Sequence, residues 1–305
     1  MEQVGEEGQL NAGVRHDGIS IGGTAAEVKP LRGHGRFDAM RRTTGFCESD
    51  GERIYYESVG EGEPTLVLCH GAGGNHAVWY QQTPVFGRHR RVISWDHRGF
   101  GRSSAQGGPT RPELAVRDLG AVLGAAGVMG PIDLVGQSMG GWTALGFALA
   151  EPARVRRLVL ADTPGGIMTA ALVVALRALG PAPLGGADVL GVHPALGASL
   201  VARDPARAYL YQMLGAFGEP ELAKIAPALF GTVVTDERLA ALAGRVLFIV
   251  GAEDRLFPTA AIRASAAKIA GARVVEIPDA GHSPYFEQPA AWNRAVAEFL
   301  AIDLG

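Results

Sequence analysis

Features that mark disulfide-rich, nucleic-acid-binding or membrane proteins are scarce in this sequence. Only two cysteines occur in 305 residues, too few for a disulfide framework, so we expect Cys47 and Cys69 to be reduced structural thiols. The formal net charge is -3 and no basic run stands out, which argues against a nucleic-acid partner. The apolar stretch 167–176 is about half the roughly 20 residues that span a bilayer, so no membrane span is expected.

Motifs for metal ions and nucleotide cofactors are also missing. The sequence has no Cys/His cluster, no H-E-x-x-H and no G-x-x-x-x-G-K-[ST]. Gly99-x-Gly101 lacks the third glycine and the helix start of a dinucleotide-binding turn. We therefore expect no metal, nucleotide or flavin cofactor. The first ten residues lack an apolar signal segment, so a cytoplasmic location is expected.

Hydrophobic patterns divide the chain into a polar beginning and a long region of alternating elements. The length suits a single α/β domain with an insertion. Residues 1–44 are rich in glycine and charge without a sustained period, which predicts a mobile N-terminal extension. From residue 45 strands and helices alternate, which predicts an α/β fold with a mostly parallel, doubly wound sheet.

The later predicted strands are apolar throughout, as strands covered on both faces must be. Strands are expected at 45–49, 53–59, 65–69, 92–95, 132–135, 157–160, 246–250 and 274–277. Helices are expected at 113–126, 141–150, 260–270 and 289–300. Between residues 165 and 235 only helical patterns occur. We therefore predict a core of residues 45–164 and 236–305, with a helical cap (lid) at 165–235.

Ser138 stands in a G-x-S-x-G turn, Gly136-Gln137-Ser138-Met139-Gly140, between a predicted strand and a predicted helix. The glycines permit a sharp turn that would project the serine hydroxyl, and the helix N-terminus places N–H groups beside it. This setting predicts a nucleophile. Earlier in the chain, a glycine-rich turn around Ala72 follows another strand, so we expect the N–H groups of Ala72 and Met139 to form an oxyanion hole. His70, in the same turn, is expected to hold the loop.

A serine nucleophile needs a base and an orienting carboxylate. Among the eight histidines, His282 alone follows the final predicted strand, where it can reach the C-terminal edge of the sheet. His76 and His97 also follow strand ends and are the alternatives. Asp254 follows the strand at 246–250 and is the predicted acid. Its alternatives are the neighbouring Glu253 and Asp162, which lies one strand earlier.

With these landmarks the sequence resembles the α/β-hydrolase family from about Gly45 to the C-terminus, apart from the insertion. The order Ser138, Asp254, His282 is the order of that family. The turn Asp96-His97-Arg98-Gly99-Phe100-Gly101-Arg102-Ser103 agrees with it. The resemblance implies ester-type acyl transfer, and a serine at position 138 argues against the dehalogenase and epoxide-hydrolase branches. The segments 137–141 and 160–163 resemble the esterase, enol-lactonase and carbon-carbon bond hydrolase branches.

The substrate is expected to be a small, mainly apolar ester, thioester or lactone. Apolar residues of the insertion are predicted to line an acyl pocket, with Trp79 as a further wall: Ile167, Met168, Leu172, Val173 and Leu176. Arg177 could instead pair with a substrate carboxylate. The alternatives are a carbon-carbon bond hydrolase, a cofactor-free perhydrolase on the same triad, and a small-lactone receptor with residual hydrolysis. Nothing in the sequence indicates an oligomeric state.

Overall fold

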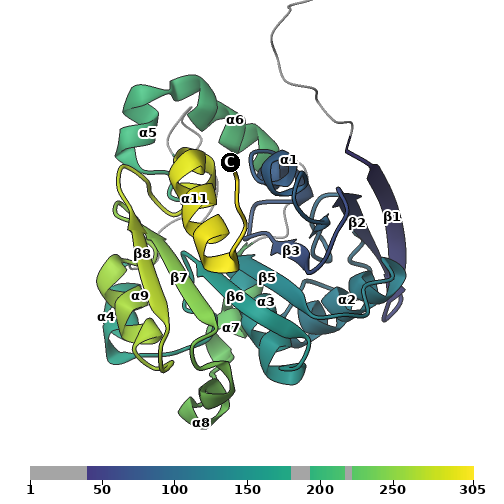
Figure 1. The fold of residues 1–305 in the computed structure, drawn as a ribbon. Coiled ribbons are helices and arrows are strands. Elements are labelled where there is room, and N and C mark those ends of the chain that lie inside the picture. Colours follow the sequence, from purple (N-terminus) through teal and green to yellow (C-terminus); the bar gives the residue numbers. More distant parts are fainter. Residues whose placement is uncertain (1–39, 180–192, 217–221) are drawn as a thin grey trace, which may run out of the picture. The chain divides into compact units, whose positions relative to one another are not determined.

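A computed structural model describes residues 40–179, 193–216 and 222–305 of the chain. Its centre is an eight-stranded sheet with the order β1-β2-β4-β3-β5-β6-β7-β8 (Figure 1). The strands are β1 (Arg42–Ser49), β2 (Glu52–Val59), β3 (Thr65–Cys69), β4 (Val92–Trp95), β5 (Ile132–Gln137), β6 (Val155–Ala161), β7 (Val246–Gly251) and β8 (Arg273–Ile277). Every predicted strand is present.

The sheet is parallel from β4 to β8 and antiparallel at its β1–β2 edge. This confirms the predicted, mostly parallel arrangement. β1 begins at Arg42 rather than at residue 45, because Arg42 pairs with Val59 and Thr44 pairs with Glu57 of β2. The predicted extension therefore ends earlier than residue 44, and its residues 1–39 lie outside the described residues.

Alternate residues of the central strands enter two hydrophobic clusters, one on each face of the sheet. In β3, Val67 belongs to one cluster and Leu66 and Leu68 belong to the other. The helices on the Val67 face are α2 (Pro112–Ala125), α3 (Met139–Ala150) and α9 (Thr259–Ala266), and those on the Leu66 face are α1 (Thr83–Phe86) and α11 (Pro289–Leu300). Because both faces are covered, the central strands β3, β4, β5 and β7 are buried at every position, and most of these positions are apolar.

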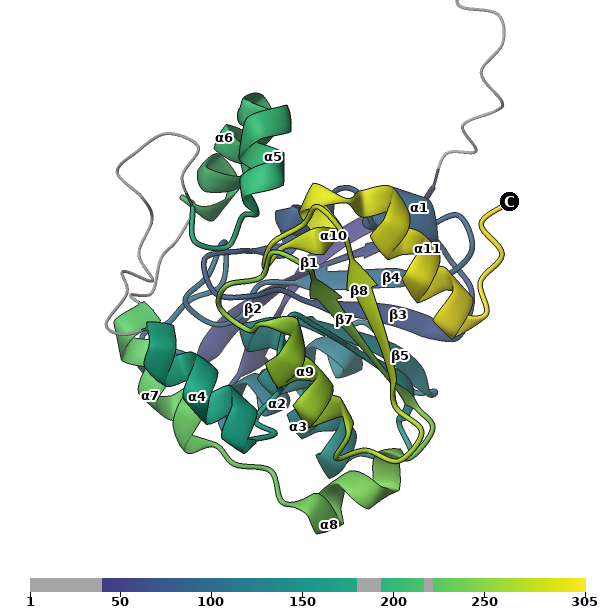
Figure 2. The same cartoon turned by 90° about the vertical axis from the view of Figure 1, so that its left-hand side faces the viewer.

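Between β6 and β7 the described part of the chain contains helices and no strand. They are α4 (Ala170–Leu179), α5 (Ala198–Arg203), α6 (Pro205–Gly215), α7 (Leu222–Gly231) and the short α8 (Asp236–Leu239). Figure 2 shows α4 and α7 on the side of α9, and α5 and α6 beyond α10 (Pro284–Glu287). Leu172 of α4 joins the Val67-face cluster and Leu200 of α5 joins the other. The helices of the predicted cap therefore pack against both faces of the sheet.

Both cysteines are buried in strands as free thiols, Cys47 in β1 and Cys69 in β3. Burial raises the pKa of Cys69 to about 12 and that of Cys47 to about 11. Neither is a reactive thiolate near neutral pH, which agrees with a structural role. Of the helices in the described ranges, none has both the length and the apolar character needed to cross a membrane.

Candidate active site

Ser138 lies in a tight turn between β5 and α3, with φ 48° and ψ -120°. A non-glycine residue in this backbone region is strained, and such strain is concentrated at functional sites. The flanking glycines make the turn sterically possible. An added Cβ at Gly136 would lie 2.3 Å from the Gly140 carbonyl oxygen, and one at Gly140 would lie 2.3 Å from the Cys69 carbonyl oxygen. The predicted strand, turn and helix around Ser138 are therefore all present.

The loop after β3 approaches this turn closely. An added Cβ at Gly71 would lie 2.1 Å from Oε1 of Gln137, so a larger residue does not fit there. Ala72 lies in this loop and lines the same cavity as Ser138 and Met139. Met139 is the first residue of α3, so its N–H has no partner within the helix. The residues of the two predicted oxyanion donors, Ala72 and Met139, thus line the same cavity as Ser138.

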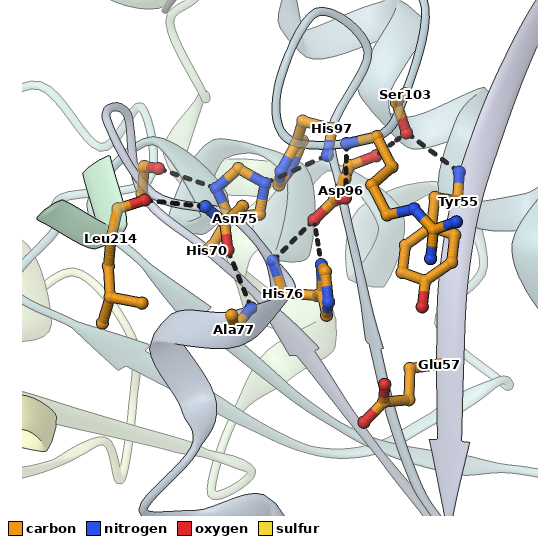
Figure 3. A network of polar contacts seen from close by, with 12 residues as sticks. Tyr55, Glu57, His70, Asn75, His76, Ala77, Asp96, His97, Ser103 and Leu214 are labelled. Atoms are coloured by element: carbon orange, nitrogen blue, oxygen red, sulfur yellow. Dashed lines mark hydrogen bonds and ion pairs between the residues drawn. The ribbon is translucent and has the colours of Figure 1, made fainter. Parts of the chain in front are cut away.

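Asn75 fixes the far end of this loop (Figure 3). Its Oδ1 accepts the N–H of Ala77 (2.9 Å), and its Nδ2 donates to the carbonyl oxygen of Leu214 in α6 (2.9 Å). The two backbones also meet, because an added Cβ at Gly215 would lie 2.7 Å from the carbonyl oxygen of Gly73. The loop that carries Ala72 is therefore tied to a helix of the insertion.

His70 holds the beginning of the loop. Its Nδ1 lies 2.8 Å from the carbonyl oxygen of Gly71, and its Nε2 accepts the backbone N–H of His97 (3.0 Å) (Figure 3). Because the accepting Nε2 carries no proton, the neutral ring is protonated on Nδ1. Burial lowers the pKa of His70 to about 4, so the ring stays neutral at pH 7. These contacts give His70 the structural role expected from the sequence.

The two alternative bases are engaged elsewhere. Nδ1 of His76 lies 2.8 Å from Oδ1 of Asp96, and Nε2 of His97 lies 3.0 Å from Oγ1 of Thr143. Neither histidine lines the cavity of Ser138. Figure 3 shows that both belong to the network that holds the turns after β3 and β4.

His282 lies in the loop after β8 and lines the cavity together with Ser138. Its Nδ1 is 2.9 Å from Oδ2 of Asp254, and the two side chains are only 4% and 0% exposed. Oδ1 of Asp254 accepts the backbone N–H groups of Leu256 (2.8 Å) and Phe257 (3.0 Å). The carboxylate is thus fixed, and it holds the proton of His282 on Nδ1, which leaves Nε2 free to accept one.

The two alternative acids have distinct surroundings. Glu253 accepts hydrogen bonds from the N–H (3.0 Å) and the hydroxyl of Ser199 in α5, so its carboxylate is held by the insertion. Asp162 lies beside Asp254, and one ligand atom from each of Asp162, Asp254 and His282 fall within 4.8 Å of one another. Both oxygens of Asp254 and Nδ1 of His282 are already engaged in hydrogen bonds. These atoms are therefore not available as ligands of a metal ion, and the cluster does not fit a metal site.

Glu287 of α10 is a buried residue next to His282 whose role is not predicted from the sequence. Its Oε1 accepts the N–H groups of Gly281 (2.9 Å) and Ser283 (3.2 Å), and its Oε2 accepts that of Gly197 (2.8 Å). It therefore fixes the residues on both sides of His282 and joins them to the insertion. Burial raises the pKa of Glu287. The signal available in the sequence was a lone carboxylate in the segment Pro284-Tyr285-Phe286-Glu287.

Ser138 faces a cavity of about 400 Å³ whose lining is mainly apolar. The volume is that of a small-molecule site. Its larger apolar side chains come from the core and from the insertion: Trp142 of α3, Leu176 of α4, Leu229 and Phe230 of α7, and Phe257 after β7. Its polar side chains are Gln137, Ser138, His193, Tyr211 and His282. Among the described lining residues none is a lysine, arginine, aspartate or glutamate.

The predicted pocket residues of the insertion are only partly on this cavity. Leu176 lines it. Ile167 and Leu172 are buried in the Val67-face cluster, and Met168 packs against that cluster. These three residues do not line the described cavity, because the apolar side chains around α4 pack the helix onto the core. Arg177 is exposed and does not line the cavity.

Trp79 also lies outside the lining of the cavity. It is fully buried on the Leu66 face, with ring centroids 4.7 Å from Tyr285 and 6.0 Å from Trp292. Trp79 does not line the described cavity, because its ring packs against Tyr285 of α10 and Trp292 of α11.

Two polar residues of the cavity come from the insertion and were not predicted. Nδ1 of His193 accepts the N–H of Ala195 (3.1 Å), so the proton of the neutral ring is on Nε2. Burial, and next the neighbouring His282, lower the pKa of His193 to about 4. The hydroxyl of Tyr211 lies 2.8 Å from that of Ser283, next to His282. No local pattern marks these residues, because helix α6 and the segment before α5 meet His282 only in the folded chain.

Known proteins similar to this chain are hydrolases. A candidate carbamate hydrolase, RutD, of Azorhizobium caulinodans is 38% identical over 109 residues, which are 36% of this chain and 40% of that protein. A second one, of Variovorax paradoxus, is 30% identical over 81% of this chain and 96% of its own length. A 2-hydroxy-6-oxononadienedioate/2-hydroxy-6-oxononatrienedioate hydrolase of Paraburkholderia xenovorans is 30% identical over 83% of this chain and 93% of its own length.

Solved structures agree. A thermophilic esterase from Thermogutta terrifontis superimposes with a TM-score of 0.71 at 28% identity, covering 86% of this chain and 98% of the esterase. The enol-lactonase from Burkholderia xenovorans gives a TM-score of 0.69 at 25% identity, covering 84% of this chain and 100% of the lactonase. The model of the alpha/beta hydrolase family matches residues 66–295. With the sheet order and the turn at Ser138, these matches show that the chain is a hydrolase of the alpha/beta hydrolase family.

Proposed function

We propose that this chain is a serine hydrolase that cleaves a small, mainly apolar ester, thioester or lactone through an acyl-enzyme. One observation carries the proposal. Ser138 and His282 line the same cavity, and Nδ1 of His282 is fixed to Asp254 at 2.9 Å. A nucleophile, a base and an orienting acid are the groups that this chemistry requires.

In the proposed reaction, Nε2 of His282 takes the proton of Ser138 as the hydroxyl oxygen attacks the substrate carbonyl carbon. Negative charge then develops on the carbonyl oxygen, and the N–H groups of Ala72 and Met139 stabilise it. The protonated imidazole gives its proton to the leaving alcohol or thiol, and Asp254 stabilises the imidazolium meanwhile. Water, activated in turn by His282, then releases the acid from Ser138.

The lining of the cavity supports the substrate class. Its volume and its apolar side chains suit a small organic acyl group, and its polar groups lie where the reaction would take place. The similarity to an esterase, an enol-lactonase and candidate carbamate hydrolases points to substrates with an ester-like carbonyl. A helical cap formed by residues 165–235 would exclude water from this carbonyl.

Carbon-carbon bond hydrolysis is the second candidate. The similar protein of Paraburkholderia xenovorans is a 2-hydroxy-6-oxononadienedioate/2-hydroxy-6-oxononatrienedioate hydrolase, and it aligns with this chain over 93% of its own length. Its substrates are dicarboxylates by name. A buried carboxylate needs a cationic partner, and no lysine or arginine is among the described residues of the cavity lining. The apolar ester is therefore the better fit.

Covalent labelling tests the proposal directly. A fluorophosphonate should label the wild type, and Ser138→Ala should abolish the labelling and lower kcat/KM for aryl esters by at least about 10⁴-fold without changing the melting temperature. Ser104→Ala is the matched control, because that hydroxyl bonds the N–H of Arg53 in β2 and does not line the cavity. A folded Ser138→Ala variant that still hydrolyses esters would refute the assignment.

The same assay separates the remaining alternatives. An enzyme turns over many equivalents of ester or lactone, whereas a lactone receptor stops after about one. A perhydrolase requires peroxide for its product. Steady-state hydrolysis without peroxide supports the proposal, and its absence on a panel of esters, thioesters and lactones contradicts it.

A further inference from the structure

A second buried carboxyl lies against the acid of the proposed triad. Asp162 follows β6 with φ 50°, and it is fully buried. Its N–H donates to the carbonyl oxygen of Ile249 (2.8 Å), and its Oδ1 accepts the N–H of Gly251 (2.8 Å). Both contacts are to β7, so the side chain is rigidly placed. A positive φ at a buried acid beside Asp254 suggests that Asp162 has a specific role, because such backbone conformations are concentrated at functional sites.

The second oxygen of Asp162 has no ordinary partner. Within the described part of the chain, Oδ2 is buried and no donor reaches it. The carboxyl group of Asp254 lies beside that of Asp162, with one oxygen of each within 4.8 Å of the other. Asp254 cannot donate, because its two oxygens already accept three N–H groups, from Leu256, Phe257 and His282. Two buried acceptors in contact form a hydrogen bond only if one of them carries a proton.

The surrounding titratable groups favour protonation of Asp162. Besides Asp254, the loop after β8 contributes His282 and α10 contributes Glu287. The remaining neighbours are phenols, Tyr211 of α6 and Tyr285 of α10. Burial first, and then the charge of Asp254, raise the pKa of Asp162 well above its usual value.

We propose that Asp162 is a positioning residue of the proposed active site: it keeps its proton and donates its O–H to Asp254, so that the pair carries one negative charge. The inference rests on the proposed function of Asp254. A second negative charge beside His282 would stabilise the protonated imidazole and so oppose its action as a base. The neutral donor fixes Asp254 without adding charge.

Two substitutions distinguish a neutral from a charged Asp162. Asp162→Ala removes the donor, so we expect kcat to fall at least about tenfold and the acidic limb of the kcat/KM profile to move to higher pH, because Asp254 becomes a stronger acceptor for the imidazolium. Asp162→Asn supplies a neutral N–H donor of similar shape. It should restore kcat to within about threefold and return the limb to within about 0.3 pH unit of the wild type.

If Asp162 were ionised, Asp162→Asn would remove a buried negative charge beside His282. The acidic limb would then move to lower pH by about one unit or more, and this result would overturn the proposal. Glu253→Gln is the matched control. Glu253 is an acid of the loop that carries Asp254, but its hydrogen bonds to Ser199 lower its pKa, so it is ionised and separate from the pair.

Infrared spectroscopy tests the proton without any catalysis. The wild type at pH 7 should show the C=O stretch of a buried protonated carboxyl, which Asp162→Asn removes and Glu253→Gln retains. The same band should be present in the inactive Ser138→Ala variant. Its absence at pH 7 would refute the shared proton even if Ser138 is labelled, whereas unlabelled Ser138 with the band present would refute only the proposed function.

Discussion

Glu253 and Asp254 are neighbours in the chain, yet their carboxylates have different partners. Asp254 turns inward to His282, and Glu253 turns to Ser199 on the insertion. Both acids come just after β7, so residue type and spacing do not show which of them orients the histidine. The one guide in the sequence is that successive side chains of an extended backbone point to opposite sides. The difference is made by the backbone N–H groups of Leu256 and Phe257, which hold Asp254 in place.

Asp254→Asn should lower kcat by about 10⁴-fold with little change in stability, because an amide favours the wrong tautomer of His282. Ester turnover at saturating substrate measures this effect. Glu253→Gln serves as the comparison and should stay within about threefold of the wild type. Equal losses in the two variants would mean that Asp254 is not the orienting acid.

At the scale of elements, α4 shows how one helix serves two purposes. Its Leu172 packs into the core, its Leu176 lines the cavity, and its Val174 is 66% exposed. Leu172 and Leu176 are four residues apart and lie on one face of the helix, one turn after the other, whereas Val174 lies on the opposite, solvent side. The sequence pattern revealed an apolar helix, but only its contacts with α9 and the core decide which residues are left for a substrate.

Leu176→Asp should weaken the preference for longer acyl chains. In the wild type each added methylene is expected to gain about 0.8 kcal/mol, or about fourfold in kcat/KM, until the cavity is filled. The charged variant should lose most of this increment, as measured with aryl esters of increasing acyl length. Val174→Asp, on the solvent side of the same helix, should retain it. A wild type without chain-length dependence would contradict the apolar pocket.

Across the whole molecule, buried histidines and buried acids give opposite pH dependences of stability. Burial lowers the pKa of His70 to about 4 and that of His97 well below its usual value. The unfolded chain therefore binds more protons below about pH 6.5, and stability is lost as the pH falls toward 4. Asp162 and Glu287 have raised pKa values, so their contribution is complete at low pH and is lost as the pH rises.

The two effects overlap above about pH 4, so we expect the histidines to make the free energy of unfolding rise with pH up to about 6.5 and the two acids to oppose this rise. Urea denaturation at several pH values measures it. His70→Asn should reduce the slope between pH 4 and 6.5 by up to about 1.4 kcal/mol per pH unit. Asp162→Asn should make the rise of stability between pH 4 and 6.5 steeper and should reduce the loss of stability above it, because above about pH 4 only the unfolded chain has lost the proton of Asp162. If neither variant changes its slope, the pKa shifts of these buried groups are not present in solution.

The sequence by itself determined the elements of this protein and the residue types at the ends of its strands. Continuous apolar runs are enough to predict a covered parallel sheet, and a glycine-flanked serine between a strand and a helix is enough to predict a sharp turn, because both depend on neighbours along the chain. The strand starting at Arg42 was missed for its first residues because polar edge strands carry no such run.

Only the tertiary structure decided which side chains share a cavity and which share a proton. Trp79, Ile167 and Leu172 are as apolar as the residues that line the cavity, but packing onto the sheet uses them. His193, in the segment before α5, and Tyr211 of α6 line the cavity with His282 although they are far away in sequence, and Asp162 meets Asp254 because β6 and β7 are adjacent in the sheet. Burial and proximity act through space, so no pattern along the chain encodes them.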